Sequence, residues 1–398
     1  MAVIVFLLLV GGVAYRATTE AERRRLLERA VRRVRRWQTA SRLSDPHILS
    51  FWTLLRERTP FAPVTPVLVG LNVLLFVLMH LGHGAAGAPE TLIAWGASVG
   101  PRTTNGEWWR LATMLFVHGS VLHLFVDLLG LIAVAPLLER LVGPAALLAV
   151  YGAAGLSSSA FGVVVSPTAV SVGASGAIFG IYGLMLAFAI GSVFDSSRPR
   201  VPWTLVTYLA PPAAVFILYS LQSSAIAVRP ELTAFVVGCI SGLFLTRGIA
   251  ERPASAIRTA PVLVGAIVMV FVTVRPLIGM TDMRPEIHKL AEAEQQMTAR
   301  YQAAIDQFSS GRLTVRELAA VIDREIMPEL QASRARVASL AHVPDEQKPL
   351  LTTAQRYLQL RDESWRLRSK ALPAADVKML TQAEMSEVAA RYALSRIE

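Results

Sequence analysis

The chain of 398 residues contains a single cysteine, Cys239. This residue lies in an apolar run, which excludes an intrachain disulfide and a cysteine-based metal cluster. Charged residues are also scarce, at 17% of the chain, whereas 53% of the residues are hydrophobic. Several apolar runs reach about 20 residues, the length that crosses a bilayer. The composition therefore predicts a polytopic membrane protein with soluble extensions.

The positive charge is concentrated in one block before the first long apolar run. Residues 16–60 hold 12 Lys and Arg against 5 Asp and Glu, whereas residues 282–398 hold 17 of each. Such a block is typical of a cytoplasmic juxtamembrane segment that meets anionic lipid, rather than of a nucleic-acid partner. Arginines at helical spacing over residues 20–37 predict a helix on the membrane surface or a solvated linker helix.

The apolar segment at the start of the chain is short. Residues 1–15 have no basic residues before their apolar stretch and no convincing cleavage site, so they are interpreted as an N-terminal anchor rather than a signal peptide.

Seven membrane spans are predicted from the apolar runs. Six of them form a core within residues 61–250, and a seventh lies within 258–278. The sixth span carries Gly238 and Gly242 at a small-xxx-small interval, which favours close helix packing. The positive-inside rule places the Ser175 end of the fourth span outside, together with the C-terminal extension. The expected location is the cytoplasmic (inner) membrane of a bacterium. The predicted spans are 63–82, 120–138, 144–165, 175–192, 203–221, 231–246 and 261–274.

The C-terminal extension, residues 282–398, is polar and has helical periodicity. Thr314-x-x-Glu317 and Thr381-x-x-Glu384 match the capping box that starts a helix. The pattern predicts a helical extramembrane domain of three or four helices, and it contains no catalytic constellation.

The stretch 172–180, Val-Gly-Ala-Ser-Gly-Ala-Ile-Phe-Gly, places Ser175 between small residues at the start of a helix. Such a serine suits a nucleophile whose attack builds an oxyanion, although the same glycines also suit a packing seam. The second span holds His123 and Asp127, four residues apart on one helix face, with His118 just before it. Ionisable groups in spans are functional candidates; the alternative is a structural polar pair.

Three motifs in this order resemble the rhomboid family of intramembrane serine proteases: Glu-Trp-Trp-Arg at 107–110, His-Gly-Ser-Val-Leu-His at 118–123 and Gly-Ala-Ser-Gly at 173–176. The resemblance implies a six-helix rhomboid-like core that cleaves transmembrane helices with a Ser–His dyad, without metal or cofactor. It implies Ser175 as the nucleophile and His123 beside the oxyanion. The substrate-binding and oxyanion region would further include His118, Gly173, Gly176, Phe179 and Phe235.

Two positions depart from the family pattern. The family has Ala-His-x-x-Gly-x-x-x-Gly in the sixth span, where this chain has Ala234, Phe235, Gly238 and Gly242, so phenylalanine stands in place of the base. The family also has an asparagine donor to the oxyanion where this chain has Asp127. A serine without a base is a poor nucleophile. Phe235 and Phe179 are expected to pack against each other across the vacated position.

The sequence thus favours a rhomboid-like pseudoprotease that binds transmembrane helices of client proteins. The alternative is an active intramembrane serine endopeptidase in which His123 and Asp127 form a relocated triad with Ser175. A third interpretation makes the membrane core an anchor for the C-terminal domain.

Overall fold

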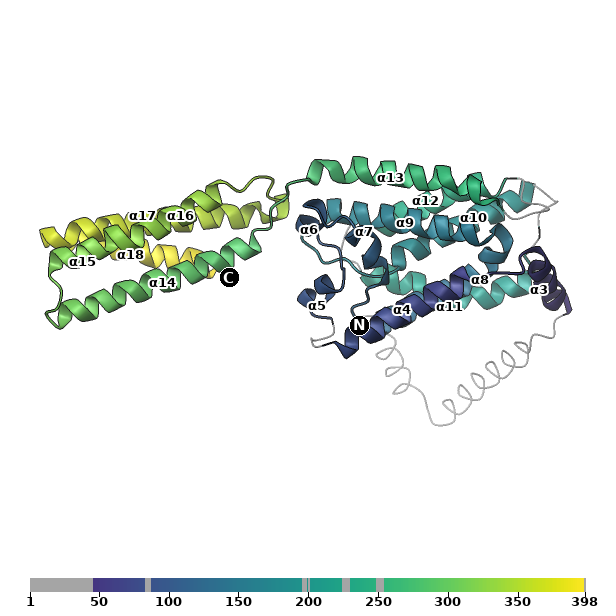
Figure 1. The fold of residues 1–398 in the computed structure, drawn as a ribbon, viewed down its shortest axis with the longest axis horizontal. Coiled ribbons are helices and arrows are strands. Elements are labelled where there is room, and N and C mark those ends of the chain that lie inside the picture. Colours follow the sequence, from purple (N-terminus) through teal and green to yellow (C-terminus); the bar gives the residue numbers. More distant parts are fainter. Residues whose placement is uncertain are drawn as a thin grey trace, which may run out of the picture. The chain divides into compact units, whose positions relative to one another are not determined.

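A computed structural model describes residues 46–82, 87–194, 199, 201–223, 230–247 and 254–396. The chain divides into two compact units, Met1–Pro276 and Leu277–Glu398. Apart from loops and one isolated bridge between Ser98 and Ser171, the described residues are helical, which confirms the predicted all-α class (Figure 1). The predicted anchor at 1–15 and residues 16–45 of the basic segment lie outside the described residues.

The first unit contains the predicted spans. Six helical segments in the described part of the chain are long and apolar enough to cross a membrane, and α12, at 16 residues, is a shorter apolar helix. This confirms a polytopic membrane protein. The short helix α3 (Pro46–Arg58) precedes the spans, which are α4 (Val64–Leu81), α8 (Val121–Val142), α9 (Pro144–Val165), α10 (Ser175–Phe194), α11 (Trp203–Ser223), α12 (Pro230–Leu245) and α13 (Ala260–Val274).

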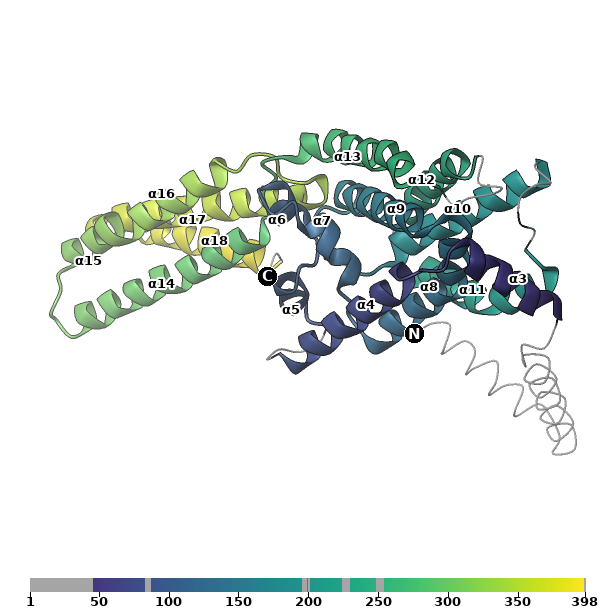
Figure 2. The same ribbon diagram turned by 45° about the vertical axis from the view of Figure 1, so that its right-hand side comes forward.

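Helix α10 packs against α12 through the predicted seam of small residues (Figure 2). A Cβ on Gly238 would stand 2.0 Å from the Gly180 carbonyl oxygen, and one on Gly183 would stand 2.2 Å from the Phe235 carbonyl oxygen. No side chain fits such an approach, so the glycines set the spacing of the two helices. On its other side α10 meets α9, where a Cβ on Gly180 would be 2.1 Å from that of Ala154.

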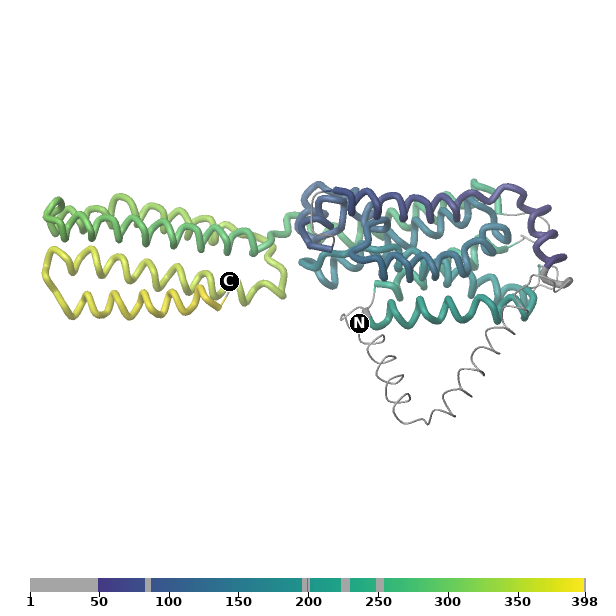
Figure 3. The backbone as a smooth tube through the Cα atoms, turned by 90° about the horizontal axis from the view of Figure 1, so that it is seen from below, coloured from purple at the N-terminus to yellow at the C-terminus, as the bar shows by residue number. Residues whose placement is uncertain are grey.

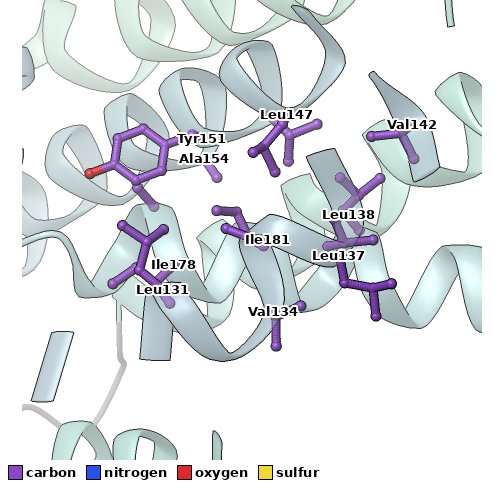
Figure 4. Close-up of a cluster of buried hydrophobic side chains, with 14 of the residues drawn as sticks. Leu131, Val134, Leu137, Leu138, Val142, Leu147, Tyr151, Ala154, Ile178 and Ile181 are labelled. Atoms are coloured by element: carbon purple, nitrogen blue, oxygen red, sulfur yellow. The ribbon is translucent and has the colours of Figure 1, made fainter. Parts of the chain in front are cut away.

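The core of this unit lies where α8, α9 and α10 meet. Buried Leu131 and Leu138 of α8, Leu147 and Tyr151 of α9, and Ile181 of α10 form part of one cluster (Figure 4). Large apolar side chains also remain exposed on the outer faces, as expected of helices whose solvent is lipid. They include Leu74, Ile132, Leu148, Ile240 and Phe271.

A buried carboxylate joins α8 to the start of α4. Glu139 is fully buried and accepts hydrogen bonds from the backbone N–H groups of Val64 (2.7 Å) and Thr65 (2.8 Å) and from the Thr65 hydroxyl (2.7 Å). These are donors that a helix start leaves without partners, and α4 has no side-chain cap of its own. The Glu139 carboxylate therefore caps α4 from another helix.

We expect Glu139→Ala to lower the free energy of unfolding by about 3 kcal/mol, because one buried and one partly buried backbone donor lose a carboxylate acceptor. Thermal unfolding of the full chain in detergent measures the change. Glu90→Gln, at an exposed position in α5 (Pro89–Ala94), is the matched control and should leave stability unchanged. A Glu139→Ala variant as stable as the control would show that solvent caps α4 equally well.

The second unit contains long helices, of which α17 and α18 form a hairpin (Figure 3). The capping box predicted at Thr314 and Glu317 is confirmed, with both reciprocal hydrogen bonds present. The one predicted at Thr381 is wrong: α18 begins four residues earlier, with Asp376 as its N-cap, and the Thr381 hydroxyl donates to the Val377 carbonyl. The helices of this unit are α14 (Arg284–Ser309), α15 (Val315–Val321), the π-helical turn Ile322–Ile326, α16 (Met327–Ala338), α17 (Lys348–Ala374) and α18 (Val377–Ser395).

A buried polar network links α14 to α17. The Glu294 carboxylate accepts from the Tyr357 hydroxyl at 2.7 Å and from Nε of Arg361 at 2.9 Å. The Arg361 guanidinium is fully buried and stacks 4.5 Å above the Trp365 ring. Burial, and next the charge of Glu294, raise the pKa of Tyr357 far above its ordinary value. The hydroxyl therefore stays a donor at any physiological pH.

This raised pKa predicts alkaline destabilisation of the second unit. Because the pKa of Tyr357 is higher in the folded than in the unfolded chain, its contribution to stability is present below about pH 10 and is lost as the pH rises further. Urea unfolding of the full chain at about pH 8 and about pH 11 tests this. We expect Tyr357→Phe to be less stable at the lower pH but to lose less on going to the higher one. Equal alkaline losses in both proteins would contradict this role.

Candidate functional site

Helix α8 carries two of the predicted site residues. It begins after Ser120, whose hydroxyl accepts from the backbone N–H of His123 at 3.1 Å, so Ser120 is the N-cap as its residue type favours. One turn separates His123 from Asp127, and the two side chains meet, with His123 Nε2 3.6 Å from Asp127 Oδ2. The shared face expected from their spacing is therefore present.

The Asp127 carboxylate is the point at which the site converges. Its Oδ2 lies 3.2 Å from Nε2 of His118 and accepts the backbone N–H of Ala174 at 2.9 Å. The His118 side chain is fully buried and that of Asp127 is 2% exposed, while that of His123 is 23% exposed. Asp127 thus ties α8 and the loop before it to the segment that leads into α10, and His123 is the member open to the surroundings.

Gly173 allows this segment to approach the histidine. Its φ of +106° lies in a region that L side chains rarely adopt, and its N–H donates to the Met114 carbonyl at 2.9 Å. A Cβ at this position would stand 2.6 Å from Nε2 of His123 and 3.3 Å from Oδ2 of Asp127. Only glycine satisfies both the backbone conformation and the contact.

Ser175 is the first residue of α10 and is half-buried. Its hydroxyl forms no hydrogen bond with any residue that the structure describes. The next residue, Gly176, packs against α9, where a Cβ would stand 2.3 Å from the Ser158 hydroxyl. The structure therefore joins His118, His123 and Asp127 with the backbone preceding Ser175, but it does not pair the serine hydroxyl with an imidazole.

The two phenylalanines of the predicted site do not form a ring pair. Phe179 instead contacts Phe216 of α11, with ring centroids 5.2 Å apart. Phe216 fits there because Gly130 of α8 leaves the space: a Cβ on Gly130 would be 2.4 Å from Phe216 Cγ. Phe235 is half-buried on α12 and packs at the margin of the hydrophobic core. The expected Phe179–Phe235 stacking is therefore corrected to Phe179–Phe216.

Two residues near the site escaped the sequence analysis, which weighed only ionisable groups in the spans. Asn72 of α4 and Tyr151 of α9 are 1% and 2% exposed. The Tyr151 ring centroid lies 6.4 Å from that of Phe116, which stands two residues before His118. Four side-chain atoms here are buried without a hydrogen-bond partner among the described residues, namely Asn72 Oδ1, Tyr151 OH, His118 Nδ1 and Asp127 Oδ1. The sequence signal that could have identified this pair is the amide side chain of Asn72 in the otherwise apolar first span.

Comparison with known proteins finds relatives of the segment that carries this site. Residues 105–251 match the Rhomboid domain. The rhomboid protease GluP of Bacillus subtilis is 32% identical over 192 residues, which are 48% of this chain and 36% of that protein. Rhomboid-like protease 3 of Toxoplasma gondii is 36% identical over 98 residues, 25% of this chain and 37% of that protein.

The relatives also include a protein named as inactive. The inactive RHOMBOID-like protein 8 of Arabidopsis thaliana is 34% identical over 85 residues, 21% of this chain and 24% of that protein. This chain spans well under half the length of each of these three relatives. The chain therefore contains a segment, residues 105–251, that is similar to the Rhomboid domain.

Proposed function

We propose that this chain is a catalytically impaired rhomboid, a pseudoprotease that binds transmembrane helices of client proteins. The observation that carries the proposal is the composition of α12, which packs along α10 and contains Phe235 but no histidine. The family resemblance assigns the base of the dyad to this helix. Without it the Ser175 hydroxyl has no imidazole on α12 to accept its proton, and losing one member of such a unit costs several powers of ten in rate.

The position of Asp127 supports the same conclusion. Its carboxylate accepts the N–H of Ala174, the residue immediately before Ser175. Oxyanion stabilisation requires donors aimed at the developing negative charge. Here the Asp127 carboxylate already accepts the neighbouring Ala174 N–H, so this N–H is not available to an oxyanion. An ionised carboxylate would also repel an oxyanion formed beside it.

The proposed setting is the cytoplasmic (inner) membrane of a bacterium, with the second unit outside and the arginine-rich segment on the cytoplasmic face against anionic lipid. The apolar outer faces of the spans would meet both lipid and client helices. No nucleic-acid partner is proposed.

The alternative function is an active intramembrane serine endopeptidase with Ser175, His123 and Asp127 in the three triad roles. The observation that favours it is the 3.6 Å approach of His123 to Asp127, with His123 the more exposed of the two. A carboxylate beside an imidazole can hold its tautomer and stabilise the imidazolium that forms.

The pseudoprotease proposal predicts that Ser175 in the native chain does not react with a fluorophosphonate probe. A model transmembrane substrate in the same vesicles should crosslink to the chain but remain intact. Phe235→His combined with Asp127→Asn restores the two residues of the family pattern, so we expect this double variant to become labelled. Adding Ser175→Ala should abolish that labelling. Labelling of the native chain to the extent seen in the double variant would overturn the proposal.

The relocated triad predicts a different response to a single substitution. If it operates, Asp127→Asn should lower cleavage of the model substrate by about 10⁴-fold, because an asparagine holds the wrong tautomer of the base. Initial rates in vesicles measure this, with His80→Gln, at an exposed position in α4, as the control. Cleavage that survives His123→Ala, or that increases in Asp127→Asn, would exclude the triad.

A further inference from the structure

The three side chains at the convergence point have the composition of a metal site. One ligand atom from each of His118, His123 and Asp127 lies within 4.8 Å of the other two. Two imidazoles and one carboxylate are a donor set that suits Zn²⁺, Fe²⁺, Co²⁺ or Ni²⁺ and does not suit Mg²⁺ or Ca²⁺, which take oxygen ligands. We propose that His118, His123 and Asp127 bind one divalent transition-metal ion, with Zn²⁺ as the best fit.

The two distances from the Asp127 oxygen to the histidine nitrogens agree with tetrahedral coordination. Zinc–nitrogen and zinc–oxygen bonds of about 2.0–2.1 Å place the corners of a tetrahedron about 3.3–3.4 Å apart. The Asp127 Oδ2 atom lies 3.2 Å from Nε2 of His118 and 3.6 Å from Nε2 of His123. The two imidazoles each place a ring nitrogen within 4.8 Å of the other, so side-chain rotation within that range would bring both to an ion held by the same oxygen.

A cation would match both the charge and the unpartnered oxygen of this cluster. Oδ1 of Asp127 is buried with no hydrogen-bond partner in the described part of the chain. With Asp127 ionised and both imidazoles neutral, the cluster would carry a net negative charge inside a membrane domain, which is costly. A single divalent ion would balance that charge and engage the carboxylate and both imidazoles.

One of the three ligands is partly exposed. His118 and Asp127 are buried, while the His123 side chain is 23% exposed and offers a route for an ion. The missing Cβ of Gly173 would lie 2.6 Å from Nε2 of His123, so glycine at this position keeps a side chain away from the coordinating nitrogen. Three protein ligands leave a fourth position for water.

A bound ion would change what the cluster can do. It would neutralise the Asp127 charge and fix the segment before Ser175 to α8. It would also occupy the Nε2 lone pair of His123, which a relocated triad needs to accept the serine proton. The metal site and the relocated triad therefore cannot operate at the same time, and the metal site does not depend on whether client helices bind.

The test uses the purified full chain in detergent after treatment with a chelator. Co²⁺ is titrated and its visible bands are followed, and Zn²⁺ affinity is measured by competition with a chromophoric chelator. The expected result is one equivalent with tetrahedral Co²⁺ bands. His123→Ala and the nearly isosteric Asp127→Asn should each weaken binding by at least about 100-fold, since outer-shell substitutions alone cost about 10–100-fold. The matched controls are His80→Ala and His288→Ala, which remove exposed histidines outside the cluster.

Size-exclusion profiles and thermal unfolding of the apo proteins check that each variant folds, and His123→Gln replaces any variant that does not. Less than one equivalent bound to the native chain, as expected if a proton alone balances Asp127, would overturn the proposal. So would affinities of the His123 and Asp127 variants within about threefold of the native value, since about 100-fold or more is the expected loss. Because the readout is metal binding, failure here leaves the crosslinking result for client helices unaffected, and the reverse also holds.

Discussion

A carboxylate buried in a membrane domain has to be balanced by donors or cations within its reach, and the Asp127 carboxylate determines how the centre of the first unit is arranged. One of its oxygens contacts the imidazole of His118 and the backbone N–H of Ala174, and His123 stands 3.6 Å away. These groups belong to the loop before α8, to α8 itself and to the segment that enters α10. Removing the carboxylate would leave the Gly173 N–H to Met114 carbonyl hydrogen bond to join the segment that enters α10 to the loop before α8.

The residues that fix the fold differ from those that would carry the chemistry. Gly183 and Gly238 set the distance between α10 and α12, because a Cβ at either of them would collide with the facing backbone. Residue 235 takes part in that contact through its backbone carbonyl oxygen, which every residue type has, and not through its side chain. A histidine or a phenylalanine there leaves the backbone seam intact, so this fold persists whether or not α12 supplies a base.

The sequence predicts the parts of this molecule that depend on local pattern. Apolar runs identify the spans, the four-residue spacing brings His123 to Asp127, and Thr314 with Glu317 marks a helix start. Contacts made by backbone groups or by distant helices were out of reach. The Ala174 N–H has no signature in the sequence, and Phe179 meets Phe216 only because Gly130 on a third helix leaves room. Thr381 had the right neighbours for a cap but lay inside a helix already begun at Val377.

The chemistry open to Ser175 follows from what occupies His123 and Asp127. An imidazole can accept the serine proton only if its Nε2 is free, and an oxyanion can form beside Ala174 only if the nearby carboxylate is neutralised. A proton or a metal ion on the cluster neutralises the carboxylate, but when it sits on His123 it also occupies the Nε2 that would accept the serine proton. An ionised cluster without a bound cation leaves Nε2 free, but its negative charge opposes the oxyanion. With no histidine on α12 to separate the two tasks, one cluster would have to perform both, and this conflict is the physical reason for proposing binding over cleavage.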